Sequence, residues 1–481
     1  QRLDPLLERL EGPPTLVDEA IDELAAEILG TQKLRIAALT VPFPGTLYGA
    51  LRLARALRRL APALKVILGG GYVSTELRAL AEPRLFRYVD YVCLDRGFMP
   101  MLGVLRHMMT HDDGDLVRTF TASDDRVAFH DHPVEEPRHA DLPAPCMQGL
   151  HLDRYIGLAE MLNPMHVLWS RQRWNKIMAA HGCYWHRCAF CDTSLDYIRN
   201  YDPAPPARIA DWMAAMQAET GSAGFHIVDE ALSPALARGL SEEILRRGMV
   251  VSWWGNVRFE AAFDDDLARL MARAGCIAVT GGLEALDDRL LGVLNKGITV
   301  AQAARACAAL SRAGMMVHAY LIYGVPSQTT QETIDALERL RQMVALGLIR
   351  SAYWHRFAAT AHSPVGADPE RFGVSLQRHE TAFAENEIPM LDPADQDREA
   401  LGRGLHRATY NYMHGRELDR DVREWFDLAV PRPRVPHDAI ERCLHGEDDA
   451  VQASPADAAP ARRSPPGRLQ PRPPPRRPRG R

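Results

Sequence analysis

The feature that most constrains the fold of this chain is a regular alternation of short apolar strands and amphipathic helices. Between residues 171 and 375, six strand-like runs alternate with five helical runs. One helix between successive strands is the pattern of a (β/α) barrel, because parallel strands need a crossover connection. Six units predict a partial (β/α)6 barrel of the TIM type. The predicted strands are 174–180, 224–228, 250–256, 276–281, 315–323 and 351–358.

A second, shorter alternation covers residues 34–110. This pattern is typical of a doubly wound, Rossmann-like parallel sheet, so the fold class is predicted to be α/β, with this domain followed by the partial barrel. Residues 1–33 are predicted to form a helical segment, and the Asp-, His- and Pro-rich residues 111–170 a linker. The predicted strands of the first domain are 34–41, 65–68 and 88–94.

The rest of the chain is less regular. Residues 376–447 carry mixed helical signals and predict a small, mostly helical C-terminal region. In residues 448–481 Pro and Arg dominate and aromatic residues are absent. Such a segment cannot bury a core, so we expect a disordered tail. A basic arm for nucleic acid and a frame error in a GC-rich gene are alternative interpretations of this tail.

Composition excludes several classes of protein. The formal net charge of −5 gives no electrostatic reason to expect nucleic acid or a membrane as a partner. No apolar run reaches the roughly 18 residues that a membrane-spanning helix needs, and no secretion signal is recognisable. Eight cysteines are too sparse for a disulfide scaffold. A cytoplasmic protein with one thiolate site is therefore expected.

The most specific motif is a cluster of three cysteines, Cys183, Cys188 and Cys191, with the spacing C-x4-C-x2-C. It follows the first predicted barrel strand, and barrel enzymes do their chemistry at the ends of strands. Cysteine thiolates are soft ligands for a metal or an iron–sulfur cluster. A zinc site would need His181 or His186 as its fourth ligand. A 4Fe–4S cluster held by three thiolates would leave one iron open. The alternative is that the three cysteines are buried residues with only a structural role.

This motif resembles that of the radical SAM enzymes, in particular members with a cobalamin-binding domain. The usual spacing is C-x3-C-x2-C, and the extra residue here is similar to members whose motif begins Gly-Cys-Tyr-Trp. The resemblance implies that the three cysteines bind a 4Fe–4S cluster whose open iron binds S-adenosyl-L-methionine (SAM). An electron donor such as flavodoxin or ferredoxin would then supply the electron that cleaves SAM to a 5′-deoxyadenosyl radical.

Residues near the ends of the predicted strands extend the resemblance. Phe190 matches an aromatic position beside adenine, and Glu230 an acidic residue that receives the SAM ammonium, with Asp229 as a weaker candidate. Arg258 is a candidate for the SAM carboxylate. Each also has a purely structural interpretation: Phe190 as a core aromatic, the acidic residue as a helix cap or solvated charge, and Arg258 as part of an ordinary salt bridge. The run 320–326 resembles the strand and turn beside adenine.

Three further runs show the same kind of match. Gly282 and Glu284 resemble a Gly-x-Glu segment, in which glycine permits close approach of a ligand and the carboxylate bonds the ribose or the ammonium. The run 295–297, Asn-Lys-Gly, is common in this subgroup, but a helix C-cap explains it without a catalytic role. The turn His362-Ser363-Pro364 resembles one of close relatives and receives no role from the resemblance.

The first domain resembles a cobalamin-binding domain. The glycine triplet after the strand 65–68 would allow a bulky cofactor to approach, and Thr40 would face the same crevice. The lower-ligand motif Asp-x-His-x-x-Gly of other cobalamin folds is missing, so the cofactor would bind base-off. A degenerate domain without cofactor is the alternative. The predicted cobalamin-binding residues are Thr40, Gly69, Gly70 and Gly71.

The leading interpretation is thus a cobalamin-dependent radical SAM methyltransferase that acts on an unactivated carbon of a small-molecule substrate. Oxidation, cyclisation or rearrangement without methyl transfer is an alternative within the class, and a non-enzymatic metal or redox sensor is one outside it. Cys307 is expected in the core, and His130, His132 and His139 are expected to be solvated linker residues. The identity of the substrate is not encoded in a recognisable motif.

Overall fold

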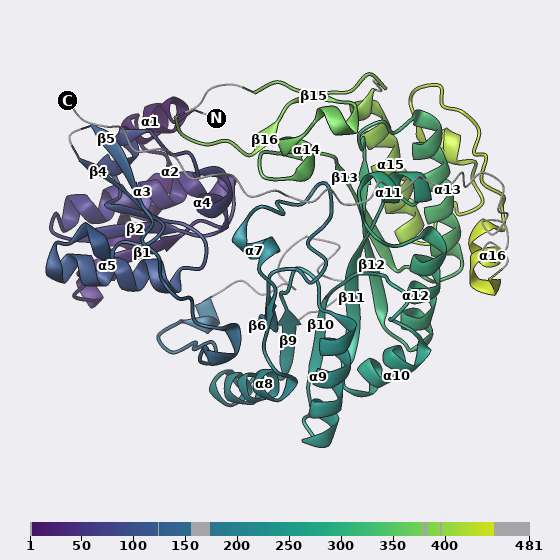
Figure 1. Ribbon diagram of the computed structural model, residues 1–481, viewed down its shortest axis with the longest axis horizontal. Helices are drawn as coiled ribbons and strands as arrows, with labels where there is room; N and C mark the ends of the chain where they lie inside the picture. Colours follow the sequence, from purple (N-terminus) through teal and green to yellow (C-terminus); the bar gives the residue numbers. More distant parts are fainter. Residues whose placement is uncertain (1, 124, 155–173, 379–381, 395–396, 447–481) are drawn as a thin grey trace, which may run out of the picture.

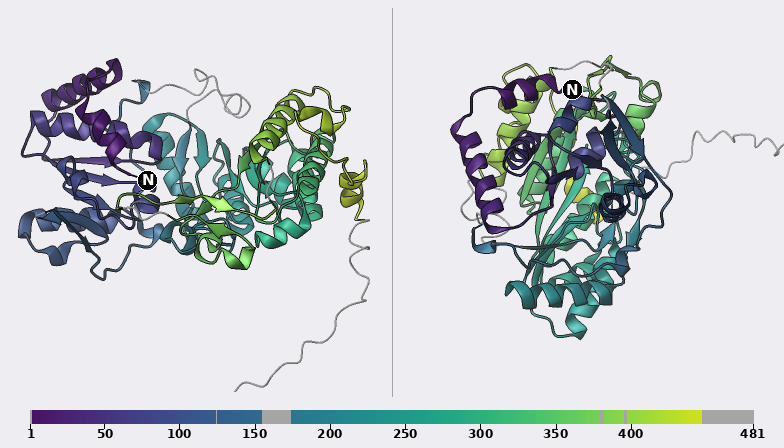
Figure 2. Two further views of the ribbon diagram at one scale, coloured as in Figure 1. Left: turned by 90° about the horizontal axis from the view of Figure 1, so that it is seen from above. Right: turned by 90° about the vertical axis from the view of Figure 1, so that its left-hand side faces the viewer.

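The computed structural model describes residues 2–123, 125–154, 174–378, 382–394 and 397–446. Two lobes lie side by side, with the N-terminal lobe at one end of the long axis and the C-terminal helices at the other (Figures 1 and 2). The predicted disordered tail lies outside the described residues, as does the later part of the predicted linker. No helix of the described residues is long and apolar enough to cross a membrane.

The N-terminal lobe is built on a five-stranded sheet in the order β1-β2-β3-β4-β5. The first three strands are parallel, as the sequence predicted, and the last two continue the sheet as an antiparallel hairpin. The predicted domain boundary at residue 110 is therefore wrong, because residues 119–123 pair with β3, and residues 126–130 pair with 119–123, instead of forming a linker. The strands are β1 (Ile36–Thr40), β2 (Lys65–Gly69), β3 (Tyr91–Cys93), β4 (Thr119–Ser123) and β5 (Arg126–His130).

The predicted helical segment 1–33 packs into this lobe. Leu3, Leu7 and Leu10 are buried in the same core as β2, and a capping box between Thr15 and Asp18 starts the second helix. The segment is therefore part of the lobe's core. The helices of the lobe are α1 (Asp4–Glu11), α2 (Leu16–Thr31), α3 (Pro44–Leu60), α4 (Gly71–Glu76) and α5 (Phe98–Thr110).

The second lobe contains the predicted partial barrel. Its six strands lie in the order β13-β12-β11-β10-β9-β6, and every neighbouring pair is parallel. Because the order follows the chain, each connection advances by one strand, as in a (β/α) barrel. The strands are β6 (Asn175–Ile177), β9 (Gly224–Ile227), β10 (Ser252–Val257), β11 (Cys276–Glu284), β12 (Met316–Tyr323) and β13 (Ser351–Arg356).

Helices on the outside of the barrel bury alternate strand residues. Phe225, Trp253 and Trp354 point into this layer and are fully buried. Side-chain caps begin several of the helices, for example Asp264 before α10 and Thr299 before α12, which fixes where each crossover starts. The helices are α8 (Pro206–Thr220), α9 (Pro234–Arg246), α10 (Asp265–Arg273), α11 (Asp288–Val293), α12 (Val300–Arg312) and α13 (Thr330–Ala345).

The chain after β13 first runs across the top of both lobes and then returns to the barrel (Figure 1). On the way it forms β14 (Ala359–Thr360), α14 (Pro364–Ala367), β15 (Ser375–Leu376), β16 (Glu387–Ile388) and β17 (Met390–Leu391). Helices α15 (Arg398–Met413) and α16 (Ala439–His445) then pack on the barrel, where Leu401 and Leu405 join its core. Cys307, on α12, lies in this core as predicted.

Candidate active site between the lobes

The three motif cysteines lie on one loop at the mouth of the barrel. This cluster loop, residues 182–195, connects the short strand β7 (Ala180–His181) to helix α7 (Asp196–Arg199). Gly182 has φ 74°, and a Cβ at this position would lie 2.3 Å from the Asn200 carbonyl oxygen, so the turn requires glycine. Cys188 is buried, whereas Cys183 and Cys191 are partly exposed. The loop thus presents its thiols toward the barrel mouth.

The surroundings of the cluster loop act differently on two of its thiols. A hydrogen bond from Cys191, together with the nearby Lys296 ammonium, lowers the pKa of Cys188, whereas the same bond and burial raise the pKa of Cys191. His181 Nε2 pairs with Asp196 Oδ2 at 2.8 Å, which leaves only Nδ1 of this ring to bind a metal. Within the described part of the chain, no three Cys, His, Asp or Glu side chains are grouped to hold a single ion. The donor set therefore fits an iron–sulfur cluster, whose ligands stand on separate irons, better than zinc.

The Asn-Lys-Gly run, for which the sequence suggested only a helix cap, braces the cluster loop. The Trp185 indole N–H donates to the Asn295 carbonyl at 2.9 Å, and the Asn295 amide donates to the Arg187 carbonyl at 2.9 Å. A Cβ on Gly297 would lie 2.1 Å from the Trp185 ring, so glycine is required for this ring to pack. The run therefore holds the cluster loop in place through Trp185 and Arg187.

Glu284, Lys296 and Gly282 form one buried unit beside the loop. The Lys296 ammonium bonds Glu284 Oε1 at 2.7 Å, and each side chain is only 7% exposed. Burial opposes the charge on Lys296, but Glu284 and Cys188 outweigh it and raise the pKa of the lysine. A Cβ on Gly282 would lie 1.8 Å from Glu284 Oε1. The glycine therefore makes room for the carboxylate of its own strand.

Arg258 reaches the same unit from the end of β10. Its guanidinium lies 4.2 Å from the Trp185 ring centre and donates to the Lys296 carbonyl. Phe190 lies on the other side of Lys296, 5.8 Å from the ammonium. The structure thus gathers Phe190, Arg258, Gly282 and Glu284 around the cluster loop, which no single stretch of sequence indicates.

Asp229 and Glu230, which end β9, have different surroundings. Asp229 accepts the backbone N–H groups of Ala179 and Ala180 at 2.6 and 3.0 Å and is 1% exposed, so it anchors the strand that leads into the cluster loop. Burial raises the pKa of Asp229 to about 7. Glu230 opens onto a cavity, where the surrounding protein raises the pKa of its carboxyl group. Of the two, Glu230 is the residue that lines the cavity.

The cavity lies between the lobes and has a volume of about 950 Å³. Its barrel wall includes Met178, His181, Tyr197 and Glu230, and these residues flank the cluster loop. Linker residues 142–146 close a further side. A space of this size, with apolar walls and few polar groups, is suited to a large ligand.

The N-terminal wall of the cavity comes from the loops after β1, β2 and β3. Gly70 and Gly71 belong to it, whereas Thr40 and Gly69 are absent from the described residues that line it. Gly70 has φ 107°, and a Cβ there would lie 2.7 Å from the Val41 carbonyl oxygen, so its glycine is required by the neighbouring loop. The described residues of this wall are Pro42, Phe43, Gly70, Gly71, Ser74, Thr75, Asp95, Arg96 and Phe98.

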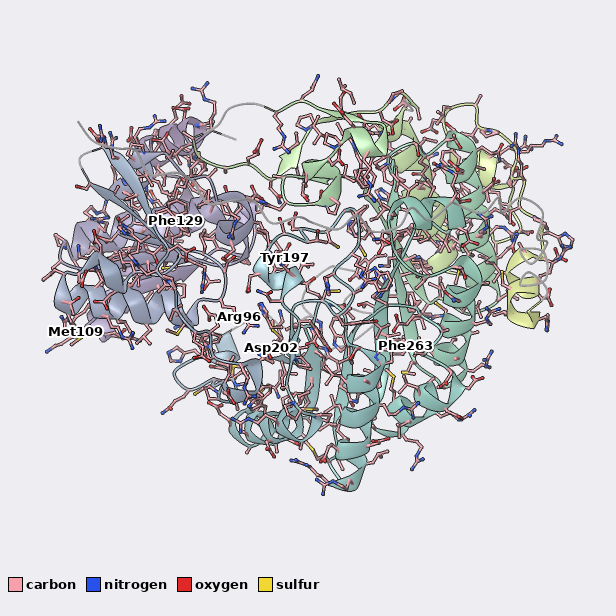
Figure 3. All side chains as sticks on the ribbon, viewed as in Figure 1. Arg96, Met109, Phe129, Tyr197, Asp202 and Phe263 are labelled. Carbon is pink, nitrogen blue, oxygen red and sulfur yellow. The ribbon has the colours of Figure 1, made fainter. Side chains whose placement is uncertain are left out.

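The prediction that His139 is a solvated linker residue is wrong. The residue is buried, its amide donates to Asp202 at 2.7 Å, and its ring bonds the Met178 carbonyl at 2.9 Å. Asp202 also receives Arg96 of the N-terminal lobe at 3.3 Å, and the two side chains meet where the lobes adjoin (Figure 3). Contacts between segments this far apart leave no local signal in the sequence.

Comparison with known proteins agrees with this arrangement. Residues 179–340 match the Radical SAM superfamily. An uncharacterized methyltransferase of Pyrococcus horikoshii is 27% identical over 32% of this chain and 34% of its own length. An anaerobic magnesium-protoporphyrin IX monomethyl ester cyclase of Rubrivivax gelatinosus is 24% identical over 66% of this chain and 56% of its own length. The chain thus spans a third to about half of these relatives.

Two solved structures share the fold over both lobes. The radical S-adenosylmethionine methyltransferase TsrM of Kitasatospora setae, with cobalamin and a [4Fe-4S] cluster bound, superposes with a TM-score of 0.59 over 90% of this chain and 91% of that one, at 15% identity. The cobalamin-dependent S-adenosylmethionine radical enzyme OxsB gives a TM-score of 0.58 over 80% and 59%, at 15% identity. At such identities the likeness concerns the fold.

Proposed function

We propose that this chain, which is a radical SAM enzyme, binds a 4Fe–4S cluster, SAM and cobalamin and transfers a methyl group to an unactivated carbon of a small molecule. One observation carries the proposal. His181 and Asp196, the residues on either side of the loop with the three cysteines, line a cavity of about 950 Å³ whose opposite wall belongs to a Rossmann-like lobe. Two cofactors held on facing walls can act on one substrate between them.

Cys183, Cys188 and Cys191 would hold the cluster. The lowered pKa of Cys188 favours the ligating thiolate, and the bracing of the loop by Trp185 and Asn295 keeps the three sulfurs in place. When bound, the cluster supplies the electron that cleaves SAM, and cobalamin supplies a carrier for the methyl group. An external donor such as flavodoxin or ferredoxin would reduce the cluster.

Glu230 is the residue of this chain best placed for the SAM ammonium, because it opens onto the cavity beside the cluster loop. Arg258 already pairs with Glu260 at 3.5 Å, but its Nε atom is buried without a hydrogen-bond partner among the described residues and could serve the SAM carboxylate. Phe190 would pack against the adenine, next to Lys296. Glu284 is held by Lys296 through Oε1, so only its other oxygen is open to the ribose.

The N-terminal wall suits base-off cobalamin. Among the described residues of that wall there is no histidine to ligate the cobalt from below. The cavity's two histidines among the described residues, His139 and His181, come from the linker and the barrel and not from this wall. The small residues Gly70, Gly71 and Ser74 leave this wall open to a flat macrocycle.

A second candidate is cyclisation or another rearrangement without methyl transfer. The match to the Rubrivivax gelatinosus cyclase covers 66% of this chain, more than the match to the Pyrococcus horikoshii methyltransferase. The same cavity and cluster loop would serve this reaction. The two candidates differ in whether the methyl group of SAM reaches cobalamin.

The test uses protein that is reconstituted anaerobically with iron and sulfide, mixed with hydroxocobalamin and freed of unbound cofactor. Methyl-labelled SAM and a reductant are then added. Thr75→Trp places a large ring on the N-terminal wall of the cavity and should block cobalamin retention. Thr31→Trp, on an exposed helix end of the same lobe, is the matched control. Gly70→Leu is unsuitable, because it would clash with the Val41 backbone.

Retention of base-off cobalamin that acquires the label, lost in Thr75→Trp and kept in Thr31→Trp, supports the methyltransferase. Retention of cobalamin that stays unlabelled while 5′-deoxyadenosine accumulates favours the second candidate. If the wild-type protein retains no cobalamin, the cofactor assignment is wrong.

A further inference from the structure

The turn His362-Ser363-Pro364, which the sequence left without a role, belongs to a short segment that crosses the cluster loop. This segment, residues 359–365, is called the strap here; it lies in the chain that runs across the top of the molecule (Figure 1). Three hydrogen bonds fasten the strap to the cluster loop: Thr360 Oγ1 to Asp192 at 2.5 Å, Ser194 Oγ to the His362 carbonyl at 2.9 Å, and the Val365 amide to the Ala189 carbonyl at 3.1 Å.

The strap is held in a fixed shape by its own residues. Ser363 is 1% exposed, and its hydroxyl donates to the Thr360 carbonyl at 2.9 Å while accepting the Gly366 amide at 3.0 Å. A Cβ on Gly366 would lie 1.9 Å from the Thr360 carbonyl oxygen, so the turn closes only with glycine. His362 therefore sits at the apex of a tight turn with little freedom of its backbone.

From this apex the His362 ring reaches the other lobe. Its Nε2–H donates to the Thr75 carbonyl at 3.0 Å. Thr75 lies on α4 and lines the cavity on the wall assigned above to cobalamin. The residue thus links that wall, through its ring, to Ser194, through its carbonyl. Ser194 is three residues beyond the cluster-loop residue Cys191.

We propose that His362 is a positioning residue that holds the cobalamin wall at a fixed separation from the cluster loop. Reactions between two bound groups depend steeply on their placement, and a misplacement of about 1 Å can cost a factor on the order of 100 in rate. The proposal deepens the proposed function and rests on it for the identity of the two cofactors. The link itself consists of protein groups only and does not depend on the identity of the cofactors.

Other contacts keep the lobes together when this link is cut. The Ala81 amide donates to the Ala382 carbonyl at 2.7 Å, and the Glu385 amide to the Glu76 carbonyl at 3.0 Å. Arg96 and Asp202 form a further contact (Figure 3). Loss of the His362 ring should therefore loosen the fit of the lobes without separating them.

The first test is amide hydrogen exchange on the full chain without cofactors. His362→Ala removes the ring bond, and Ser194→Ala removes the bond at the other end of the same link. His362→Ala should speed exchange at Ala81 and Glu385 at least threefold. Ser194→Ala should have a smaller effect, because Thr360 and Val365 still fasten the strap to the cluster loop, and it should add little to His362→Ala. His362→Gln retains a side-chain N–H donor and should restore part of the protection. His414→Asn, at an exposed helix end, is the control and should change nothing.

The second test follows function in the reconstituted, cobalamin-loaded protein. His362→Ala should retain iron and cobalamin as the wild type does, but transfer labelled methyl groups to cobalamin about tenfold to a hundredfold more slowly. Unchanged exchange and unchanged transfer in His362→Ala would overturn the proposal, as would faster exchange in Ser194→Ala than in His362→Ala. If the wild type binds no cobalamin, the proposed function fails, and the exchange measurement still decides whether His362 links the lobes.

Discussion

Replacing Lys296 by Met should destabilise the folded protein by about 3–5 kcal/mol, because it leaves a buried carboxylate without its partner. Lys296 Nζ lies 2.7 Å from Glu284 Oε1, and both side chains are 7% exposed. At an effective dielectric constant of about 20, charges at this distance attract by about 6 kcal/mol. Desolvation costs several kcal/mol per ion, so the intact pair contributes little net stability while a single partner is costly.

The assay is urea unfolding of the anaerobic apo protein, comparing Lys296→Met, Glu284→Gln and the double variant. Each single variant should lower the unfolding midpoint, with Lys296→Met losing the most because the charge on Glu284 remains. The double variant should lose less than Lys296→Met alone, since it leaves no unpaired ion. The exposed pair Arg312–Asp265, at 2.9 Å, is the control, and Arg312→Met should cost less than about 1 kcal/mol.

The reasoning is refuted if Lys296→Met costs no more than Arg312→Met. It is also refuted if the double variant loses the sum of the two single losses, because the pair would then not be coupled.

Three further outcomes follow from the site and its surroundings. Changing Cys183, or either of the other two cluster-loop cysteines, to Ala should abolish both the retention of four irons per chain and the cleavage of SAM. Cys307→Ala, in the barrel core, should change neither, as measured by iron analysis and a product assay. Gly282→Ala should cost about 1–3 kcal/mol in the same urea assay, because its Cβ would displace the Glu284 carboxylate. Burial, aided by His355, lowers the pKa of His318 to about 4 in the folded protein, against about 6.5 in the unfolded chain. The neutral ring therefore favours the folded state fully above pH 6.5, and up to about 3 kcal/mol of stability is lost as the pH falls toward 4. His318→Asn should flatten that acid-side loss in pH-dependent unfolding, and the exposed His111→Asn should not.

Regular patterns in the sequence were enough to predict the architecture. Six apolar runs separated by helices predicted the six parallel strands, because each strand and helix carries its own periodicity. The hairpin of β4 and β5 was missed, since its Asp- and His-rich surroundings resemble a linker. Its alternation over residues 119–130 was the available signal.

The candidate site was predictable only where its chemistry is local. The spacing of Cys183, Cys188 and Cys191 lies within nine residues, so the sequence displays it directly. The pairing of Lys296 with Glu284, and the link from His362 to Thr75, join residues from different elements. Such contacts arise when the elements pack, and a single sequence carries no record of them.

At Gly70 the structure gives a reason for glycine that the sequence did not. The triplet predicted a place where a cofactor approaches the backbone, and Gly70 does line the cavity. The residue that excludes a Cβ, however, is Val41 of the adjacent loop. The reason why a position requires glycine thus depends on what packs against it in the fold, and the surrounding sequence does not show this.

The most direct test of the central claim is electron paramagnetic resonance of the reduced, reconstituted protein with and without SAM, paired with analysis of the products. If the three thiolates leave one iron open, the reduced cluster should give a signal that SAM perturbs, and 5′-deoxyadenosine should appear. A protein that holds four irons per chain but shows the same signal with and without SAM, and forms no 5′-deoxyadenosine, would contradict the account.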